Sequence, residues 1–219
     1  EHRRQVDAVV TAATAAAGQR HPVVLLHDGG GARQATVDAL PRIIDWYRAH
    51  GYTFVRVDGS RVDQLGKSEL AQLRLYKIGF VFQAYNLIPV LTARENVEFV
   101  MQLQGIAATE RGDKAMQILK EVGLDGLENR RPGELSGGQQ QRVAVARAIV
   151  SEPSLVLADE PTANLDSKTA TALMEMLVHM NTEHNVTFIF STHDKLVMDF
   201  SRRLIKLQDG KIVEDVRRG

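Results

Sequence analysis

LSGGQQQR at residues 135–142 and SLVLADEPTANLD at residues 154–166 lie within one helix length of each other. The first string continues as QQQRVAVARAIV, in which apolar residues recur at helical spacing, and no helix breaker precedes Pro153. We therefore predict a helix with small residues at its N-terminus. Such a helix end presents unpaired backbone N–H groups and the positive end of the helix dipole, which together favour binding of an anion such as phosphate.

The second string contains the short apolar run 155–158 and closes on Asp159 and Glu160. We predict a buried parallel strand whose carboxylates lie at its C-terminal edge, where open α/β sheets bind ligands. One carboxylate can hold Mg²⁺ through its water shell, and the next can orient a water molecule. Each string alone also fits a plainer interpretation, a helix capped by Ser136 or a solvent-exposed acidic strand end. Their order and spacing together favour phosphate chemistry.

These residues resemble the ATP-binding subunits of ABC transporters, and further marks of that family are present. FVFQ at residues 80–83 ends an apolar strand on a glutamine, as the family's Q-loop does. STHD at residues 191–194 follows a predicted strand at 186–190, as the family's switch histidine does, and NLD at residues 164–166 is similar to its D-loop. FVFQAYNLIPVLTARENVE and RPGELSGGQQQRVAVARA are similar to the branch that includes lipoprotein-release and macrolide-export ATPases, and the resemblance covers about residues 57–216.

The resemblance implies ATP and Mg²⁺ as ligands and a role for each matching residue. Asp159 would support Mg²⁺, and Glu160 would be the catalytic base or the carboxylate that orients water. His193 would contact the γ-phosphate, while Gln83 would sense Mg²⁺ and couple the site to a permease. Residues of the signature string, which would grip the nucleotide of an opposing subunit, and of the D-loop complete the expected nucleotide site: Ser136, Gly137, Gly138, Gln139 and Asp166.

The fold class that the resemblance implies is α/β. It is a P-loop-NTPase-like, three-layer, mostly parallel sheet with a helical lobe inserted at residues 84–133, within an ABC ATPase-like core at residues 58–219. By resemblance, the lobe contacts the membrane subunit, although its apolar residues Leu87, Ile88, Val90 and Leu91 would otherwise be interpreted as packing. Sequence patterns predict helices at 92–104, 109–122, 167–181 and 194–200, and a closing hairpin around Asp209 and Gly210.

One mark of the family, the P-loop, is not found, because the pattern GxxxxGK[ST] is absent from the sequence. Gly66-Lys67-Ser68 does not qualify, since Arg61 occupies the first glycine position. Arg33 is the only cation next to the glycine-rich turn at residues 29–31, and Ala35-Thr36 stands where the Lys-Ser pair should be. The family's P-loop supplies most phosphate contacts within one subunit. We therefore expect weakened ATP affinity and a weakened head-to-tail dimer.

The opening third, residues 1–57, instead resembles the C-terminal part of polysaccharide deacetylases, in the string HPVVLLHDGGGARQATVDALPRIIDWYRAHGYTFVRV. Its pattern predicts a βαβ unit that would complete the sheet. The resemblance places Leu26 and His27 at that family's active site, but the metal-binding Asp and His motifs are not found before residue 20. Beside an ABC-type ATPase, two alternatives therefore stay open: a recombinant, chimeric α/β protein with little or no ATPase activity, and a carbohydrate deacetylase remnant.

Composition sets further bounds on the function. The 219 residues, 44% hydrophobic and 25% charged, suffice for one sizeable α/β domain, and 27 Lys plus Arg balance 27 Asp plus Glu, which gives no indication of nucleic acid as a partner. The absence of cysteine excludes disulfides and thiolate chemistry. No run approaches the roughly 18 apolar residues of a membrane span. We expect no direct membrane insertion, a cytoplasmic location at the inner face of the membrane, a separate permease subunit as partner, and a homodimer.

Overall fold

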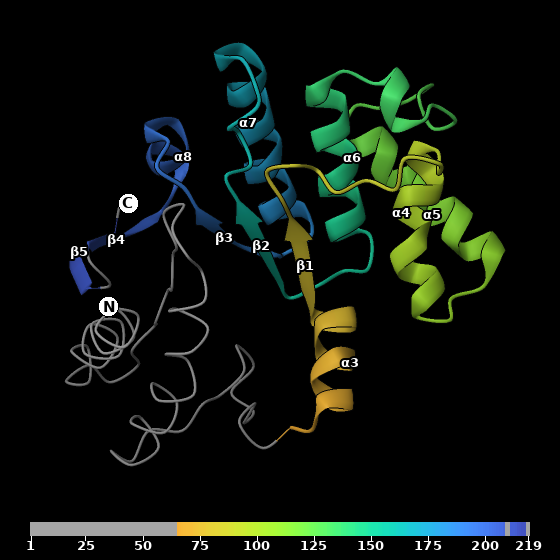
Figure 1. Cartoon of the computed structure of the whole chain (residues 1–219), viewed down its shortest axis with the longest axis horizontal. Coiled ribbons are helices and arrows are strands. Elements are labelled where there is room, and N and C mark those ends of the chain that lie inside the picture. The colour runs from red at the N-terminus through yellow and green to blue at the C-terminus, as the bar shows by residue number, and fades with distance from the viewer. Residues whose placement is uncertain (1–64, 209–210, 218–219) are drawn as a thin grey trace, which may run out of the picture. The chain divides into compact units, whose positions relative to one another are not determined.

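The computed structural model describes residues 65–208 and 211–217 (Figure 1). The expected βαβ unit of residues 1–57, with Leu26, His27 and the glycine-rich turn, lies outside these residues. The chain divides into two compact units, of which one is Leu65–Phe200 and the other includes the residues from Ser201 onward.

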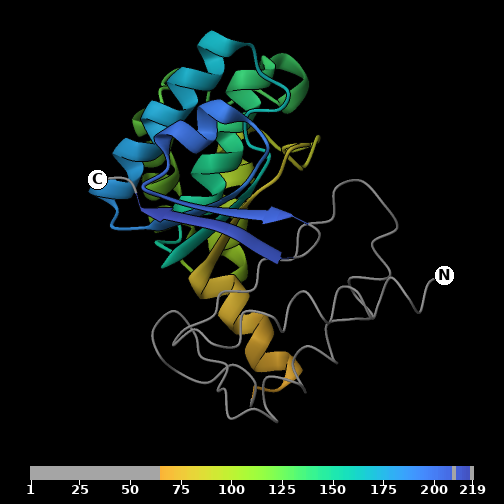
Figure 2. The ribbon, with the colours of Figure 1, turned by 90° about the vertical axis from the view of Figure 1, so that its left-hand side faces the viewer.

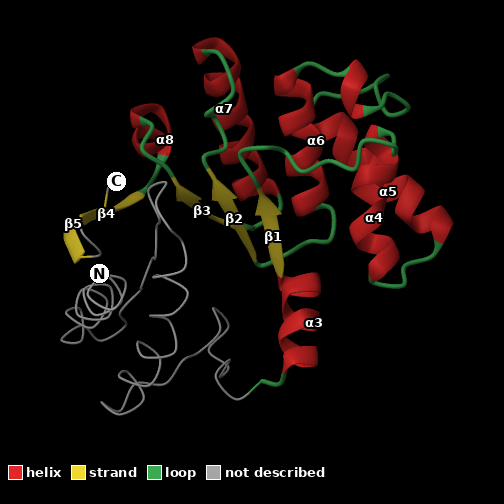
Figure 3. Ribbon diagram, in the orientation of Figure 1, coloured by secondary structure: helices red, strands yellow, loops and turns green. Residues whose placement is uncertain are grey.

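A parallel three-stranded sheet, in the order β1-β2-β3, forms the centre of the first unit (Figures 1 and 3). Its strands are β1 (Ile78–Val81), β2 (Leu155–Asp159) and β3 (Thr187–Ser191). The register places Val81 beside Ala158 and Ala158 beside Phe190. The strands expected at 155–158 and near 186–190, and their parallel pairing, are confirmed. Because parallel strands end on the same side of a sheet, the loops that follow them lie at one edge.

The strand before Gln83 ends earlier than FVFQ predicts. β1 ends at Val81, and the N–H of Tyr85 donates to the carbonyl oxygen of Phe82 at 3.1 Å, so the chain already turns at Phe82. Tyr85 and Asn86 then adopt left-handed backbone, with φ of 59° and 50°. Gln83 consequently lies in a turn beyond the sheet edge and not in the strand itself.

Helices α6 (Gly137–Ile149) and α7 (Ser167–Glu183) contact each other, and α6 also packs against β1. The helix predicted to follow the signature string is thus confirmed, and α7 extends two residues beyond its predicted end at 181. Burial of apolar side chains from both helices and the sheet is the main favourable contribution to this packing. The buried core includes Val143, Val145 and Ile149 of α6, Leu173, Leu177 and Met180 of α7, and Val81 and Val156 of the sheet.

A helical lobe is formed by α4 (Ala93–Leu103) and α5 (Ala108–Glu121), which pack on each other beyond α6 (Figure 1). Both helices lie within one residue of their predicted bounds. A capping box fixes the start of α4: Thr92 Oγ1 accepts from the N–H of Glu95 at 3.2 Å, and Glu95 Oε2 accepts from the N–H of Thr92 at 2.8 Å. The short 3-10 helix η1 (Pro132–Glu134) precedes the signature string.

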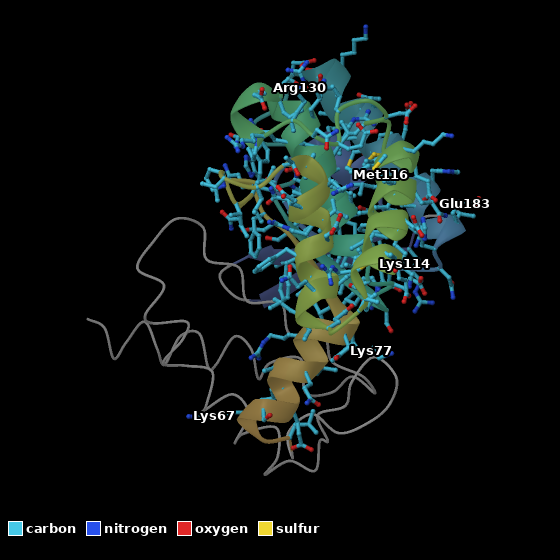
Figure 4. All side chains as sticks on the ribbon, turned by 90° about the vertical axis from the view of Figure 1, so that its right-hand side faces the viewer. Lys67, Lys77, Lys114, Met116, Arg130 and Glu183 are labelled. Atoms are coloured by element: carbon cyan, nitrogen blue, oxygen red, sulfur yellow. The ribbon has the colours of Figure 1, made fainter. Side chains whose placement is uncertain are left out.

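Helix α3 (Lys67–Lys77) leads directly into β1 (Figure 2), and Figure 4 labels the lysines at its two ends. Its first turn is closed by Glu69, whose Oε2 accepts from the N–H of Gly66 at 2.7 Å. Gly66, Lys67 and Ser68 thus form the start of an ordinary helix. Gln104 Nε2 donates to the carbonyl oxygen of Leu75 at 2.9 Å and so joins α3 to the end of α4.

After β3, the short helix α8 (Lys195–Phe200) closes the first unit, in agreement with the prediction. The second unit contains an antiparallel hairpin of β4 (Arg203–Gln208) and β5 (Lys211–Arg217), which confirms the expected closing hairpin, although its turn at Asp209 and Gly210 lies outside the described residues. In residues 65–208 and 211–217, no helix combines the length and the apolar character that crossing a membrane requires.

Candidate functional site

Four of the candidate residues lie at or just beyond the carboxyl ends of the strands, where the loops drawn in green in Figure 3 begin. Gln83 follows β1, Asp159 ends β2 and is followed by Glu160, and His193 follows β3. The N–H of Glu160 donates to the carbonyl oxygen of Ser191 at 2.9 Å, which continues the contact between β2 and β3 past the strand ends. Residues that are up to 110 positions apart in the sequence are therefore brought to one edge by the parallel strand order.

Glu160 is held by the loop after β3. Its Oε1 lies 2.6 Å from His193 Nδ1 and accepts from the backbone N–H of His193 at 3.2 Å, while its Oε2 accepts from Thr192 Oγ1 at 3.1 Å. The backbone of Glu160 has a φ of 44°, a left-handed conformation that is uncommon for a residue with a side chain and is often found at functional sites. These contacts together fix the direction of the carboxylate.

The two side chains of this pair differ sharply in their exposure. Only 11% of the Glu160 side chain is exposed, against 88% for His193. The pKa of His193 is raised, chiefly by its hydrogen bond to the Glu160 carboxylate and also by the charge of that carboxylate. Because an ionised carboxylate only accepts hydrogen bonds, Nδ1 carries a proton. When the ring is protonated, its exposed Nε2 can also donate to an anion near the buried carboxylate.

We expect an NMR titration of the His193 imidazole to give a pKa above the ordinary value of about 6.5. Glu160→Gln should return this pKa toward that value, because the partner then carries no charge. Since the folded-state pKa is raised, the pair's contribution to stability is fully present below the unfolded-state pKa and is lost as pH rises through the folded-state pKa. Glu183→Gln, at the exposed end of α7, is the matched control. An unchanged His193 titration in Glu160→Gln would contradict the pairing.

Asp159 and Gln83 have the chemistry that a Mg²⁺ ion needs. Asp159 is exposed at the end of β2, and no group in the described ranges donates a hydrogen bond to its carboxylate. The Gln83 side chain is also exposed, and the carbonyl oxygen of this residue accepts from Asn164 Nδ2 at 3.0 Å. The described part of the chain contains no cluster of three or more His, Cys, Asp or Glu side chains that could form a metal cage. Mg²⁺ is usually held by one or two carboxylates, waters and substrate phosphates, and the Asp159 carboxylate is of the type that could take part.

The N-terminus of α6 is capped by its own first residues. Ser136 Oγ accepts from the N–H of Gln139 at 3.3 Å, and Gln139 Oε1 accepts from the N–H of Ser136 at 2.9 Å. The plainer interpretation of Ser136 as a helix cap is therefore correct. It is compatible with anion binding, because the first-turn N–H groups of Gly137 and Gly138 lack partners one turn earlier.

Both signature glycines lie where neighbouring side chains leave little room for a Cβ atom. A Cβ atom at Gly137 would lie 2.9 Å from the Tyr85 hydroxyl, and one at Gly138 would lie 2.5 Å from Thr169 Cγ2. Side chains from the loop after β1 and from the start of α7 thus lie close against the first turn of α6.

Asp166 acts as the N-cap of α7 in the structure. Its Oδ1 accepts from the N–H groups of Lys168 and Thr169 at 3.1 and 3.0 Å, and its Oδ2 accepts from Thr169 Oγ1 at 2.6 Å. These hydrogen bonds, with that of the Thr169 side chain first, lower the pKa of Asp166. The carboxylate therefore serves the helix start, and its expected role in nucleotide binding stays a prediction.

Sequence reasoning missed the polar residues that tie α6 to the edge loops. Gln141 is buried and donates from Nε2 to the carbonyl oxygen of Pro161 at 2.8 Å, next to Glu160. Arg147 donates to two carbonyl oxygens in the loop after β1. A signal for Arg147 was present, because it is the single charge in the apolar run VAVARAIV.

A family model described as ABC transporter matches residues 53–163 of the chain. An uncharacterized ABC transporter ATP-binding protein of Thermotoga maritima is 46% identical over 165 residues, which are 75% of this chain and 70% of that protein. The lipoprotein-releasing system ATP-binding protein LolD of Geobacter metallireducens is 44% identical over 161 residues, which are 74% of this chain and 72% of LolD. The chain therefore belongs to the ABC transporter family.

Solved structures support the same assignment. The dimeric ATP-binding cassette MJ0796 of Methanocaldococcus jannaschii, in a post-hydrolysis state bound to ADP and Pi, matches with a TM-score of 0.66 and 43% identity. The match covers 74% of this chain and 72% of that one. The expected fold class, an ABC-ATPase-like α/β fold with a parallel sheet, is confirmed for the described residues. The resemblance to lipoprotein-release and macrolide-export ATPases is matched by relatives of those names.

Proposed function

We propose that the chain is the ATP-binding subunit of an ABC transporter, which binds and hydrolyses Mg-ATP to drive a membrane permease. The observation that carries this proposal is the buried Glu160 carboxylate paired with the exposed His193 imidazole, directly beyond Asp159 at the carboxyl edge of the sheet. The names of the relatives, and the ADP and Pi in the MJ0796 structure, agree with it.

Glu160 would orient the attacking water or accept its proton. An ionised carboxylate offers about four lone-pair sites, and hydrogen bonds from Thr192 and His193 occupy three of them. One site is left for a water molecule. His193 would donate from Nε2 to the γ-phosphate, where it would stabilise negative charge in the transition state.

Mg²⁺ would be held by Asp159, with Gln83 in its coordination or water shell. When bound, the ion neutralises phosphate charge. Ser136, Gly137 and Gly138 would bind the nucleotide of an opposing subunit at the N-terminus of α6, where first-turn N–H groups and the helix dipole favour an anion. This arrangement needs a dimer, and the relative MJ0796 is dimeric.

The helical lobe would face the permease at the cytoplasmic side of the membrane. It carries exposed apolar side chains, including Phe99 and Leu103 of α4 and Met116 of α5, which Figure 4 labels. In the loop before α4, Val90 is 72% exposed, whereas Leu87 packs against the core. The apolar residues of this loop are thus divided between packing and exposure, and the exposed ones suit a protein partner.

Apart from His193, the phosphate contacts that the P-loop would make within the same subunit are not assigned to any of the described residues. The glycine-rich turn at 29–31 and Arg33 are candidates for them, but they lie outside the described residues. The resemblance of residues 1–57 to polysaccharide deacetylases, and a chimeric origin of the chain, stay predictions for the same reason.

Titration calorimetry with Mg-ATP tests the proposed function. We expect saturable binding that Asp159→Asn weakens at least about tenfold, because the substitution removes the carboxylate that would hold Mg²⁺. Asp125→Asn, at an exposed position in the helical lobe, is the matched control and should bind like the unmodified chain. Loss of binding in Arg33→Ala would assign the phosphate contacts to the glycine-rich turn. No binding up to millimolar Mg-ATP would contradict the proposal and leave a folded α/β protein without the activity.

A further inference from the structure

The guanidinium of Arg147 on α6 holds two consecutive carbonyl groups in the loop after β1. Nη1 donates to the carbonyl oxygen of Asn86 at 2.6 Å, and Nη2 donates to that of Tyr85 at 2.9 Å. Both residues have left-handed backbone, with φ of 59° and 50°, although neither is glycine. A loop in this conformation needs contacts from outside to keep it there. The planar, two-pronged guanidinium is suited to two neighbouring acceptors, whereas a lysine ammonium is a single point charge.

The guanidinium of Arg147 is partly withdrawn from water, which is unfavourable for a charged group. Burial lowers the pKa of its guanidinium. Within the described ranges, no carboxylate forms an ion pair with it, so main-chain carbonyls are its partners. A charge withdrawn from water is costly unless hydrogen bonds satisfy it. The two hydrogen bonds to the loop therefore offset the desolvation of the Arg147 charge.

The same loop is held from two further directions. Asn164 Nδ2, in the loop after β2, donates to the carbonyl oxygen of Gln83 at 3.0 Å. The Tyr85 hydroxyl lies so close to Gly137 that a Cβ there would be 2.9 Å from it. Residues 83–86, which we call the Q-loop turn, are thus bonded to Arg147 near the end of α6 and to Asn164 of the D-loop, and Tyr85 lies against the start of α6.

We propose that Arg147 is a positioning residue, which sets the conformation of the Q-loop turn and thereby holds Gln83 at the sheet edge and Tyr85 against the signature glycine Gly137. It touches neither nucleotide nor metal in this role. The position of the Q-loop turn is set by α6, because two of its carbonyl groups accept hydrogen bonds from Arg147 on that helix. It is not set by β1, which has already ended at Val81. The role of Gln83 as a Mg²⁺ sensor rests on the proposed function, but the conformational role of Arg147 does not.

Amide hydrogen exchange of the full chain without nucleotide tests the conformational role directly. We expect exchange at residues 83–88 to rise at least about tenfold in Arg147→Gln, since the turn loses both charged hydrogen bonds. Arg147→Lys should raise the exchange rate less, because lysine keeps the charge but lacks the paired N–H donors of the guanidinium. Tyr85→Phe should leave the exchange at 83–88 nearly unchanged, because the Arg147 hydrogen bonds go to main-chain carbonyls.

Arg142→Gln is the matched control. Arg142 also lies on α6, and its Nη1 donates to a main-chain carbonyl oxygen, that of Val122, at 2.6 Å. Its substitution should raise exchange around Val122 and leave residues 83–88 as they were. Exchange at 83–88 that is unchanged in Arg147→Gln, or that rises equally in Arg142→Gln, would overturn the proposal.

The functional consequence has a separate measurement. We expect Arg147→Lys to raise the Mg²⁺ concentration that gives half-maximal ATP hydrolysis by about threefold or more, a shift of at least 0.65 kcal/mol by RT ln 3. Loss of folded protein would lower the maximal rate without moving this concentration, so the two effects can be told apart. A chain that hydrolyses no ATP in any form would contradict the proposed function, and the exchange result would still decide the role of Arg147. An unmoved half-maximal Mg²⁺ concentration would overturn the link to Gln83.

Discussion

Glu160→Gln is expected to lower the rate of ATP hydrolysis at least about 100-fold, within the range that a positioned general base contributes. Glutamine has nearly the same shape as glutamate but no charge. It therefore cannot accept a proton from water, and His193 loses its negatively charged partner. Mg-ATP binding should persist, because Asp159 and the signature residues are unchanged. Phosphate release at saturating Mg-ATP measures the first effect, and calorimetry measures the second.

The matched control is Glu110→Gln on α5, where the carboxylate is solvent-exposed and forms a helical ion pair with Lys114. The control should hydrolyse ATP at the rate of the unmodified chain, since exposed pairs of this kind contribute little to stability. A Glu160→Gln variant that keeps more than about a tenth of the rate would contradict general-base catalysis by Glu160. A thermal melt of both variants separates this outcome from a loss of folding.

Gly79→Ala is expected to lower the free energy of unfolding by about 3 kcal/mol or more, at the upper end of what overpacking costs. A Cβ atom at this position would lie 2.3 Å from the carbonyl oxygen of Ala148 and 3.0 Å from Val156 Cγ2. The first of these is main chain of α6, and the second belongs to a fully buried side chain of β2. Strand and helix would have to move apart, and the core between them would open. Urea denaturation gives the free energy from the midpoint and slope.

Gly112→Ala serves as the control, because Gly112 lies within α5 and a Cβ there would meet no atom within 4 Å. This variant should be more stable by about 0.5–1 kcal/mol, since glycine weakens a helix interior relative to alanine. An unchanged denaturation midpoint for Gly79→Ala would contradict the close approach of α6 to β1.

Local sequence patterns determined the elements and the family. Apolar periodicity predicted α4 and α5 to within one residue and the existence and start of α6, because helical faces are encoded within a few neighbouring positions. The apolar runs and the acids that follow them predicted β2, β3 and their shared edge. The strings around Gln83, Gly137 and His193 indicated the ABC transporter family, which the comparisons confirm.

Only the tertiary structure decided how the side chains at that edge are used. Sequence alone gave no distance between Glu160 and His193, since residues 33 positions apart pair only when β2 and β3 lie side by side. It likewise did not show that Asp166 caps α7, that β1 ends at Val81, or that the Q-loop turn is bonded to Arg147, 61 and 62 positions away. Left-handed backbone at ordinary residues such as Tyr85 is set by contacts between distant parts of the chain. No local pattern encodes such contacts, and the fold had to bring them together.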